Sequence, residues 1–330
     1  MSSYDYPVGI VGAGAWGTAL AAVMADIHGK ALLWARDPSL VAAINAAHEN
    51  ADYLPAIPLP ASIMASNDMD DLARCAILLI VTPAQHLRHF LTNMPDIRSP
   101  LLLCCKGIEA GTGALMVDIA REVRPVNPVA ILSGPTFAHE VAARKPAAMT
   151  LACEHEALGE QLAQAVAAPY FRPYWTDDVI GAEIGGAVKN VLAIGCGVVD
   201  GAGLGLNARA SLIARGFAEM QRYGIARGAR PETLAGLSGL GDLVLTCSSE
   251  NSRNFSLGKG LGQGQSAADL LNGRRTVAEG AATAPVLLAS AQALGADMPI
   301  VAAVCRLLDG SADVNEVIKA LLSRPLKAER

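Results

Sequence analysis

Aromatic side chains are scarce in this sequence, in which phenylalanine, tryptophan and tyrosine make up only 4% of 330 residues. Hydrophobic residues nevertheless make up 52% of the chain, and glycine occurs 32 times. A core built from such residues is aliphatic and closely packed around bare backbone, so the composition excludes a disordered chain. Since a single hydrophobic core rarely grows beyond ~250–300 residues, we expect two domains.

An excess of positive charge is also missing. The chain has 26 lysine and arginine residues against 31 aspartate and glutamate residues, for a formal net charge of −5. This balance excludes a protein that binds nucleic acid through a general positive field. No basic residue precedes Lys30, so the positively charged start of a secretory signal is absent and we expect a cytoplasmic protein.

Membrane-spanning runs and metal-binding patterns are lacking as well. The uncharged stretch 280–296 contains Pro285 and is closed by Asp297, which predicts a buried helix and no integral membrane segment. The seven cysteines include no C-x-x-C pattern and are expected to be small core residues in a reducing compartment. The six histidines all lie in the first half, and His86 and His89 have no partner at ligand spacing, so we expect no metal.

Short apolar runs alternate with segments of helical pattern in the first half of the chain. Near-continuous apolar strands are typical of a parallel sheet covered on both faces. The pattern therefore predicts a Rossmann-type, doubly wound α/β domain over residues 1–181, with ligand-binding loops at the carboxyl ends of its strands. The expected strands are residues 8–11, 31–35, 76–81, 101–105, 129–132 and 148–152.

Strand signals fade after about residue 180, where segments rich in alanine, leucine and glycine take over. They predict an all-α second domain over residues 182–330. Because no low-complexity linker is present, a helix should enter this domain directly near residues 181–186. The expected helices are residues 182–199, 208–223, 239–246, 281–294, 301–308 and 314–322.

A glycine-rich turn follows the first expected strand directly. Gly12, Gly14 and Gly17 form a G-x-G-x-x-G pattern before a helical segment. In such a turn the first glycine permits the tight bend, the second lets the backbone approach a pyrophosphate, and the third lets helix and strand pack closely. Although an ordinary glycine-rich turn is the alternative, this position predicts that the first domain binds a dinucleotide.

The end of the second expected strand bears on the choice of cofactor. An NAD-selective fold usually has an acidic residue there, whereas this chain has Arg36, with Asp37 one position further on. An arginine at this place can hold the 2′-phosphate of NADP. We therefore expect NADP(H) to be favoured, while Asp37 leaves NAD(H) open.

Two later strand ends carry polar residues at the same expected ligand rim. Lys106 would place a cation over cofactor and substrate, and the segment from Gly134 to Thr136 would offer backbone N–H groups and a hydroxyl. The alternative for Lys106 is a solvated surface lysine. Its position directly after the apolar run 101–105 argues against that setting.

The second half contains a Lys-Asn pair, Lys189 and Asn190, within an apolar helical segment. Because burial of an unpaired ammonium is costly, such a lysine lies at a cleft or is paired. Partial burial and nearby cations lower the pKa of a lysine from about 10.4 toward the operating pH. With no histidine in this half, Lys189 is the best candidate for proton transfer.

Further polar residues in the second half complete the candidate site. Asp242 and Thr246 are four residues apart and would share one helix face. The triplet Ser252, Arg253 and Asn254 offers a charged fork with neutral donors, which suits a phosphate monoester or a cofactor phosphate. Such a triplet is common in loops, so its weight comes from the other residues.

Together these motifs resemble the NAD(P)-dependent glycerol-3-phosphate dehydrogenases of the bacterial soluble type. The resemblance implies reversible reduction of dihydroxyacetone phosphate to sn-glycerol 3-phosphate, which supplies phospholipid synthesis. The matching segments run almost from end to end: Gly-Ala-Gly-Ala-Trp-Gly-Thr-Ala-Leu from Gly12, Lys-Gly-Ile-Glu from Lys106, Ser-Gly-Pro-Thr-Phe-Ala from Ser133, Val-Lys-Asn-Val from Val188, Asn-Ala-Arg from Asn207, Gly-Leu-Gly-Asp-Leu from Gly239, Ser-Arg-Asn from Ser252 and Ala-Glu-Gly from Ala278.

The resemblance also implies roles for single residues. Lys189 matches the family's proton acceptor, with Asp242 to position it and Lys106 beside them in catalysis. Sequence leaves open whether Asp242, which would raise the pKa of Lys189, or Arg253, which would lower it, dominates. The implied substrate contacts are Lys106, Gly134, Thr136, Lys189, Asn190, Asp242, Thr246, Ser252, Arg253 and Asn254. The implied cofactor contacts are Gly12, Gly14, Ala15, Trp16, Gly17, Arg36, Lys106, Ala138, Arg253, Val277 and Glu279, with Ala15 standing where serine is common.

Two alternatives remain at this point. A β-hydroxyacid or ketopantoate-type reductase also joins a Rossmann domain to a helical one, but it needs a carboxylate clamp and does not explain Lys106 and Asp242 together. A nicotinamide-sensing binding protein would keep the three glycines and need neither Lys189 nor Asp242. The expected partner is a small phosphorylated substrate, and the apolar second domain favours a homodimer.

Overall fold

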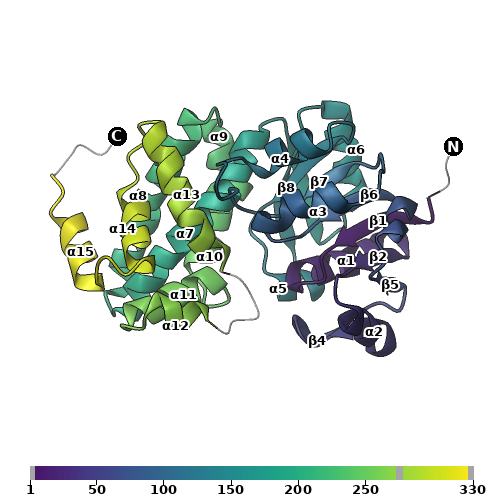
Figure 1. The fold of residues 1–330 in the computed structure, drawn as a ribbon, viewed down its shortest axis with the longest axis horizontal. Helices are drawn as coiled ribbons and strands as arrows, with labels where there is room; N and C mark the ends of the chain where they lie inside the picture. The colour runs from purple at the N-terminus through teal and green to yellow at the C-terminus, as the bar shows by residue number, and fades with distance from the viewer. Residues whose placement is uncertain (1–3, 273–277, 326–330) are drawn as a thin grey trace.

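The structure is a computed structural model that describes residues 4–272 and 278–325. A half built around a β-sheet and a half built from helices lie side by side along the long axis of the molecule (Figure 1). The sheet half comes from the N-terminal part of the chain, and the helical half comes from the C-terminal part.

The sheet has eight strands in the order β10-β9-β8-β7-β6-β1-β2-β5. Neighbouring strands are parallel, except that β8 and β9 are antiparallel. From β5 to β8 the order is that of a doubly wound nucleotide-binding sheet, with the topological switch between β1 and β6. The strands are β1 (Tyr6–Val11), β2 (Ala31–Trp34), β5 (Ile63–Ser66), β6 (Cys75–Ile80), β7 (Leu101–Leu103), β8 (Val129–Ser133), β9 (Ala147–Ala152) and β10 (Phe171–Thr176), beside a separate antiparallel pair, β3 (Glu49–Asn50) and β4 (Leu54–Pro58).

Helices cover both faces of this sheet, as the sequence predicts. Successive strand residues point to opposite faces, so Ile10 packs with α1 and α6, whereas Val11 packs with α3 and α4. This confirms the doubly wound α/β class. The helical elements of this half are α1 (Ala15–His28), α2 (Pro38–Ala47), η1 (Asp70–Arg74), η2 (Ala84–His86), α3 (Leu87–Asn93), α4 (Met116–Val123), α5 (Ala138–Ala142) and α6 (Glu156–Val166).

One expectation about the sheet is wrong. The apolar run at residues 148–152 was expected to belong to a parallel sheet, but β9 is antiparallel to β8. An apolar run reports burial on both faces, which is typical of parallel strands but also occurs for an antiparallel strand inside a mixed sheet. Strand β10 escaped sequence analysis because it lies at the sheet edge, where Tyr174 is 54% exposed.

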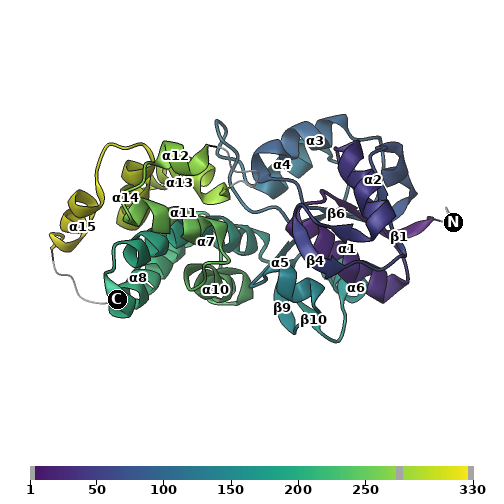
Figure 2. The same cartoon turned by 90° about the horizontal axis from the view of Figure 1, so that it is seen from below.

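The second half is all-α, as expected, and no strand occurs in it among residues 179–272 and 278–325. Helix α7 lies at its centre, with α8, α11 and α13 around it (Figure 2). Helix α7 begins at Val179, three residues before the predicted start of the second domain. The division into residues 1–181 and 182–330 stays a prediction. The helices are α7 (Val179–Gly201), α8 (Gly205–Ala226), α9 (Pro231–Leu234), η3 (Leu237–Gly241), α10 (Asp242–Cys247), α11 (Arg253–Gly262), α12 (Ala267–Leu271), α13 (Glu279–Ala293), α14 (Pro299–Leu308) and α15 (Val314–Leu322).

Two details of the second half differ from expectation. The segment 239–246 is not one helix, because the π-helical turn η3 precedes α10. The triplet at Ser252 is not a loop. Ser252 caps α11 by accepting a hydrogen bond from the backbone N–H of Phe255 at 3.2 Å, and serine is among the residues preferred at such a position.

Glycines bring α7 and α11 unusually close together. A Cβ atom on Gly197 of α7 would lie 2.0 Å from the carbonyl oxygen of Phe255, and one on Gly258 of α11 would lie 1.9 Å from that of Ile194. Only glycine fits at both positions, since such distances are far inside van der Waals contact. This crossing sets the start of α11 against the middle of α7.

Helix α7 is long and apolar enough to cross a membrane by length and composition, but 94% of its most apolar window is buried inside the protein. The stretch 280–296, predicted to be a buried helix, forms most of α13, and only part of that helix is buried. All seven cysteines are free, and all but Cys305 are buried, as expected for small core residues.

Candidate functional site

The glycine-rich turn between β1 and α1 has the geometry that a dinucleotide needs. Gly12 has a φ of +108°, which favours glycine, and a Cβ atom on Gly17 would lie 1.8 Å from the carbonyl oxygen of Gly12. A Cβ atom on Gly14, in contrast, would meet no atom within 4 Å. Gly14 also begins α1 without a side-chain cap, so the first amides of the helix have no side-chain partner and can bind a phosphate.

Other predicted cofactor residues lie around this turn. Ala15 and Trp16 are the half-buried first residues of α1, Ala138 is the first residue of α5, and Arg36 is exposed just after β2. Val277 lies outside the described residues. Glu279 is the first residue of α13, and burial raises the pKa of its carboxyl group, while the cations of Arg253, Lys106 and Lys189 act in the opposite direction.

Three charged side chains from both halves meet at the carboxyl edge of the sheet. Lys106 follows β7, Lys189 belongs to α7, and Asp242 is the first residue of α10. Asp242 Oδ2 accepts from Lys106 Nζ at 2.6 Å, and its Oδ1 accepts from Lys189 Nζ at 2.6 Å. Asp242 is fully buried and Lys189 is only 7% exposed.

Neutral groups complete this cluster. Lys189 Nζ also donates to Thr246 Oγ1 at 3.0 Å, and the Thr246 hydroxyl lies 3.3 Å from Asp242 Oδ1. Lys106 Nζ donates to the carbonyl oxygen of Gly134 at 3.2 Å. The structure therefore brings together five of the predicted site residues, although they are spread from position 106 to position 246 of the chain.

The environment of Lys189 lowers its pKa to about 8. Burial is the largest cause, the adjacent Asp242 carboxylate acts against it, and the Lys106 ammonium lowers the pKa further. Burial therefore dominates over the Asp242 carboxylate, and the cation that lowers the pKa of Lys189 is Lys106 and not Arg253. A lysine with this pKa can either donate or accept a proton near neutral pH.

A second polar group lies next to Lys189, where α7, α11 and α13 meet. Asn254 Nδ2 donates to Asn190 Oδ1 at 3.0 Å, and Asn254 Oδ1 accepts from the backbone N–H of Gly280 at 2.9 Å. Arg253, the first residue of α11, is exposed beside this group. The start of α11 therefore combines a guanidinium with helix N–H groups, a combination that suits a phosphate.

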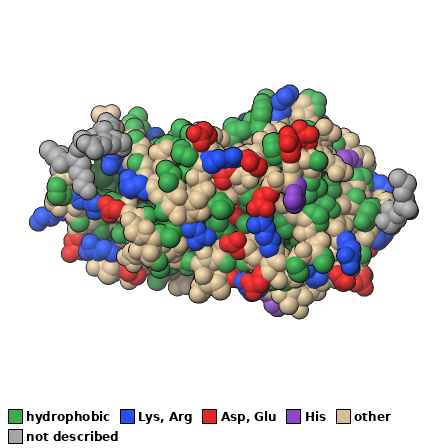
Figure 3. Space-filling model, turned by 90° about the horizontal axis from the view of Figure 1, so that it is seen from above, with side chains coloured by type: hydrophobic (Ala, Val, Ile, Leu, Met, Phe, Trp, Pro, Cys, Tyr) green, Lys and Arg blue, Asp and Glu red, His purple; other side chains and the backbone are tan. Residues whose placement is uncertain are grey.

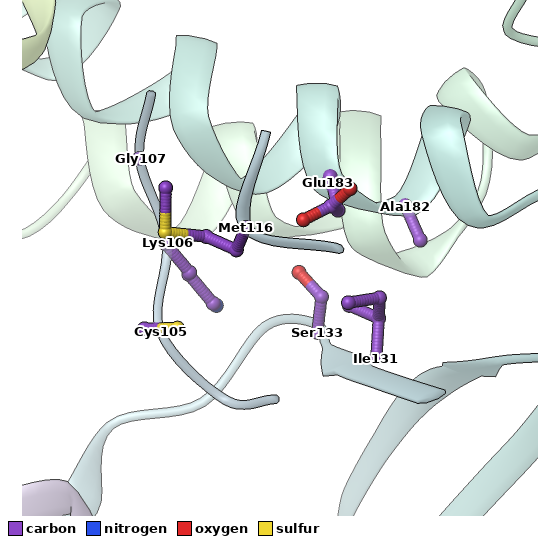
Figure 4. Close-up of a pocket in the computed structure, with 8 residues that line it drawn as sticks. All are labelled: Cys105, Lys106, Gly107, Met116, Ile131, Ser133, Ala182 and Glu183. Carbon is purple, nitrogen blue, oxygen red and sulfur yellow. The ribbon is translucent and has the colours of Figure 1, made fainter. Parts of the chain in front are cut away.

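A small pocket beside Lys106 contains a residue that sequence analysis missed. Figure 4 shows Glu183 of α7 facing Ser133 at the end of β8 across this pocket. Glu183 Oε1 accepts from the backbone N–H of Val117 at 3.0 Å, and burial raises its pKa to about 8. The signal was available, because Glu183, like Lys189, is a charged residue within the apolar part of α7.

Charges of both signs are mixed on the face of the molecule drawn in Figure 3. Lysine and arginine side chains alternate with acidic ones on the face drawn in Figure 3, with no broad area of one sign. Among residues 4–272 and 278–325, no group of three or more His, Cys, Asp or Glu side chains could hold a metal ion.

Family sequence profiles match both halves of the chain. The profile for the N-terminus of NAD-dependent glycerol-3-phosphate dehydrogenase matches residues 7–159, and the profile for its C-terminus matches residues 178–319. The chain belongs to this family. It is an NAD(P)-dependent dehydrogenase, and neither a ketopantoate-type reductase nor a binding protein without catalysis agrees with these matches.

Curated relatives of this family member are similar over its full length. Glycerol-3-phosphate dehydrogenase [NAD(P)+] 1 of Sphingopyxis alaskensis is 59% identical over 100% of this chain and 99% of its own. The glycerol-3-phosphate dehydrogenase [NAD(P)+] of Erythrobacter litoralis is 59% identical over 98% of this chain and 97% of its own. The crystal structure of glycerol-3-phosphate dehydrogenase from Coxiella burnetii superposes with a TM-score of 0.92 at 37% identity, covering 97% of this chain and 100% of that one.

Proposed function

We propose that this family member interconverts dihydroxyacetone phosphate and sn-glycerol 3-phosphate with NAD(P)H, using Lys189 for proton transfer, and so supplies phospholipid synthesis. The observation that carries the proposal is the contact of Lys106, Asp242 and Lys189 at the carboxyl edge of the sheet. That edge also holds the glycine-rich turn, because β1 and β6 flank the topological switch.

The three charged groups fit the chemistry of the carbonyl oxygen. The bound nicotinamide supplies or accepts the hydride. As dihydroxyacetone phosphate is reduced, negative charge develops on its carbonyl oxygen, and Lys189 stabilises and protonates that oxygen. In the reverse direction, neutral Lys189 removes the hydroxyl proton. Asp242 fixes the position of Lys189 through the 2.6 Å contact and holds Lys106 on its other oxygen.

The start of α11 fits the phosphate group of the substrate. A phosphate monoester carries about −1.5 to −2 charges at neutral pH. Arg253 and the first amides of α11 supply positive charge and donors, with Ser252 and Asn254 on either side. Because Asn254 is bonded to Asn190, the neighbour of Lys189, a phosphate held here would orient the carbonyl toward the lysine. Gly134 and Thr136 lie beside Lys106, because Lys106 Nζ and the Thr136 hydroxyl both donate to the Gly134 carbonyl oxygen.

NADP(H) is the favoured cofactor in this proposal, with NAD(H) accepted. Arg36 is exposed at the end of β2, where a 2′-phosphate would lie. Asp37, which could bind the ribose hydroxyls instead, caps α2 by accepting from the backbone N–H of Ser39 at 2.9 Å. The Asp37 carboxylate is therefore already engaged, which supports a preference for NADP(H).

We further propose that the protein is a cytoplasmic homodimer. Helix α8 supports the dimer, because apolar side chains at its start and end are exposed: Leu204 is 43% exposed, Leu206 is 70% and Ile225 is 54%. A second copy of the chain would cover these side chains. The cytoplasmic location rests on the seven free cysteines, which suit a reducing compartment.

Substitution of Lys189 and of Arg253 should have different kinetic effects. Lys189→Ala should lower kcat by ~10²–10⁴-fold, since it removes the proton donor. Arg253→Ala should mainly raise KM for dihydroxyacetone phosphate, by ~10-fold or more, since it removes a charged hydrogen bond. Steady-state kinetics with dihydroxyacetone phosphate and with unphosphorylated dihydroxyacetone would measure both.

The exposed Arg98 provides a matched control, because Arg98→Ala removes an arginine between α3 and β7. It should leave both constants unchanged. If Arg253→Ala impaired the unphosphorylated analogue as much as the phosphate ester, Arg253 would not bind the phosphate.

The pH dependence should report the pKa of Lys189. Reduction needs protonated Lys189 and should slow as the pH rises through about 8, whereas oxidation needs the neutral form and should accelerate over the same range. The profile of kcat/KM in both directions, begun at about pH 7 to avoid the substrate phosphate with its pKa near ~6, measures this. Lys106→Met should move the inflection to higher pH, because Lys106 lowers this pKa. An inflection near ~10.4, the value of an exposed lysine, would contradict the assignment.

Arg36 should determine the choice between the two cofactors. Arg36→Ala should lower kcat/KM for NADPH by ~10-fold or more, through loss of a charged hydrogen bond, and should leave the value for NADH unchanged. Initial rates with each cofactor at saturating dihydroxyacetone phosphate give the ratio. An unchanged ratio would show that another residue selects the cofactor.

The homodimer can be tested by sedimentation velocity at micromolar concentration. We expect a species with twice the mass of one chain, and Leu206→Glu should convert it to the monomer, because a buried unpaired charge destabilises an apolar interface. Only monomer for the unaltered protein would reject the dimer.

A further inference from the structure

Asn50 is a fully buried polar residue in β3, outside every motif discussed above. Its side-chain amide donates to the carbonyl oxygen of Ala13 at 2.9 Å and to the hydroxyl of Thr18 at 2.7 Å. Its Oδ1 accepts from the backbone N–H of Tyr53 at 3.2 Å. Both amide hydrogens and the carbonyl oxygen of Asn50 are thus engaged.

Two of these partners belong to the glycine-rich turn and its helix. Ala13 stands between Gly12 and Gly14, and Thr18 is a fully buried residue in the first turns of α1. The Thr18 hydroxyl also lies 3.5 Å from the carbonyl oxygen of Ala13. Asn50 therefore holds the turn from its buried side and joins it to α1.

The orientation of one peptide group follows from this contact. In a trans peptide the C=O and the next N–H point in opposite directions. Because the carbonyl of Ala13 points inward to Asn50, the N–H of Gly14 points outward. That is the open side of the turn, where a Cβ atom on Gly14 would meet nothing within 4 Å.

We propose that Asn50 is a positioning residue that aims the Gly14 N–H at the cofactor pyrophosphate and thereby sets the affinity for NAD(P)H. Asn50 does not touch the cofactor. It acts by fixing the Ala13–Gly14 peptide before the cofactor binds, so that no reorientation is needed on binding. The proposal rests on the dinucleotide site at this turn and not on the identity of the substrate.

The position of Asn50 also connects two parts of the cofactor site. The segment that follows Arg36 runs through α2 into β3 and β4 before the chain returns to the sheet. Strand β4 packs against α1 and α5, and α2 and β4 lie near α1 (Figures 1 and 2). Asn50 is therefore the hydrogen-bonded link between the segment that begins at Arg36 and the turn that would bind the pyrophosphate.

The decisive variant is Asn50→Ala, compared with Asn45→Ala at an exposed asparagine of α2 as a control. Asn45 also makes two side-chain hydrogen bonds, donating to the carbonyl of Ala65 and accepting from its N–H, both at 2.9 Å, but it has no contact with the turn. The measurements are the Kd for NADPH by titration calorimetry without substrate, the kinetic constants at saturating NADPH, and the urea midpoint of unfolding.

We expect Asn50→Ala to raise the Kd for NADPH by about 10-fold, which corresponds to ~1.4 kcal/mol. At saturating NADPH, kcat and KM for dihydroxyacetone phosphate should stay within about 2-fold of the unaltered protein. Asn45→Ala should lower the urea midpoint and leave the Kd unchanged. If both variants lowered the midpoint and neither changed the Kd, Asn50 would have only a structural role and the proposal would be wrong.

Two further variants keep the test decisive if Asn50→Ala does not fold. Asn50→Asp has the same shape but no donors, so it should raise the Kd at least as much; an unchanged Kd would overturn the proposal. Thr18→Val keeps the bond from Asn50 to Ala13 and should bind NADPH almost normally. Because the Kd is measured without substrate, a failure to reduce dihydroxyacetone phosphate would count against the proposed function and leave this inference standing.

Discussion

One buried carboxylate holds the candidate active site together. Asp242 is fully buried and contacts two ammonium groups, Lys106 from the sheet half and Lys189 from α7. Loss of one partner from a buried ion pair leaves an uncompensated charge and costs ~3–5 kcal/mol. The carboxylate therefore fixes both lysines and joins the two halves. With both lysines protonated, the cluster carries one excess positive charge in a chain whose net charge is −5.

Glycine makes this arrangement possible at several helix contacts. A Cβ atom on Gly186 would lie 2.9 Å from Ser133 Oγ and 3.3 Å from the Lys106 side chain, so the bare backbone of α7 lets Lys106 reach across to Asp242. Gly197 and Gly258 likewise let the backbones of α7 and α11 approach each other closely. Many of the 32 glycines thus serve contacts between helices as well as the phosphate-binding turns near strand ends.

Much of the site could be predicted where the residues that form a motif are close together in the sequence. The spacing of Gly12, Gly14 and Gly17 specified a turn, and the polar pair at Lys189 stood out in an apolar helix. Other features had no local signal. Asn50 lies far from the turn that it orients, and β9 reverses direction without any change in its apolar pattern. Such contacts depend on which segments the fold brings together.

The sequence by itself determined the doubly wound sheet, the all-α second half and the residue types of the site, because strand and helix periodicity and glycine spacing are properties of neighbouring residues. Only the tertiary structure decided how these residues act. The pKa of Lys189 falls to about 8 through burial and the approach of Lys106, and both depend on packing between segments that are distant in the chain. Electrostatic energy depends on distance and on the surrounding medium, and sequence order specifies neither.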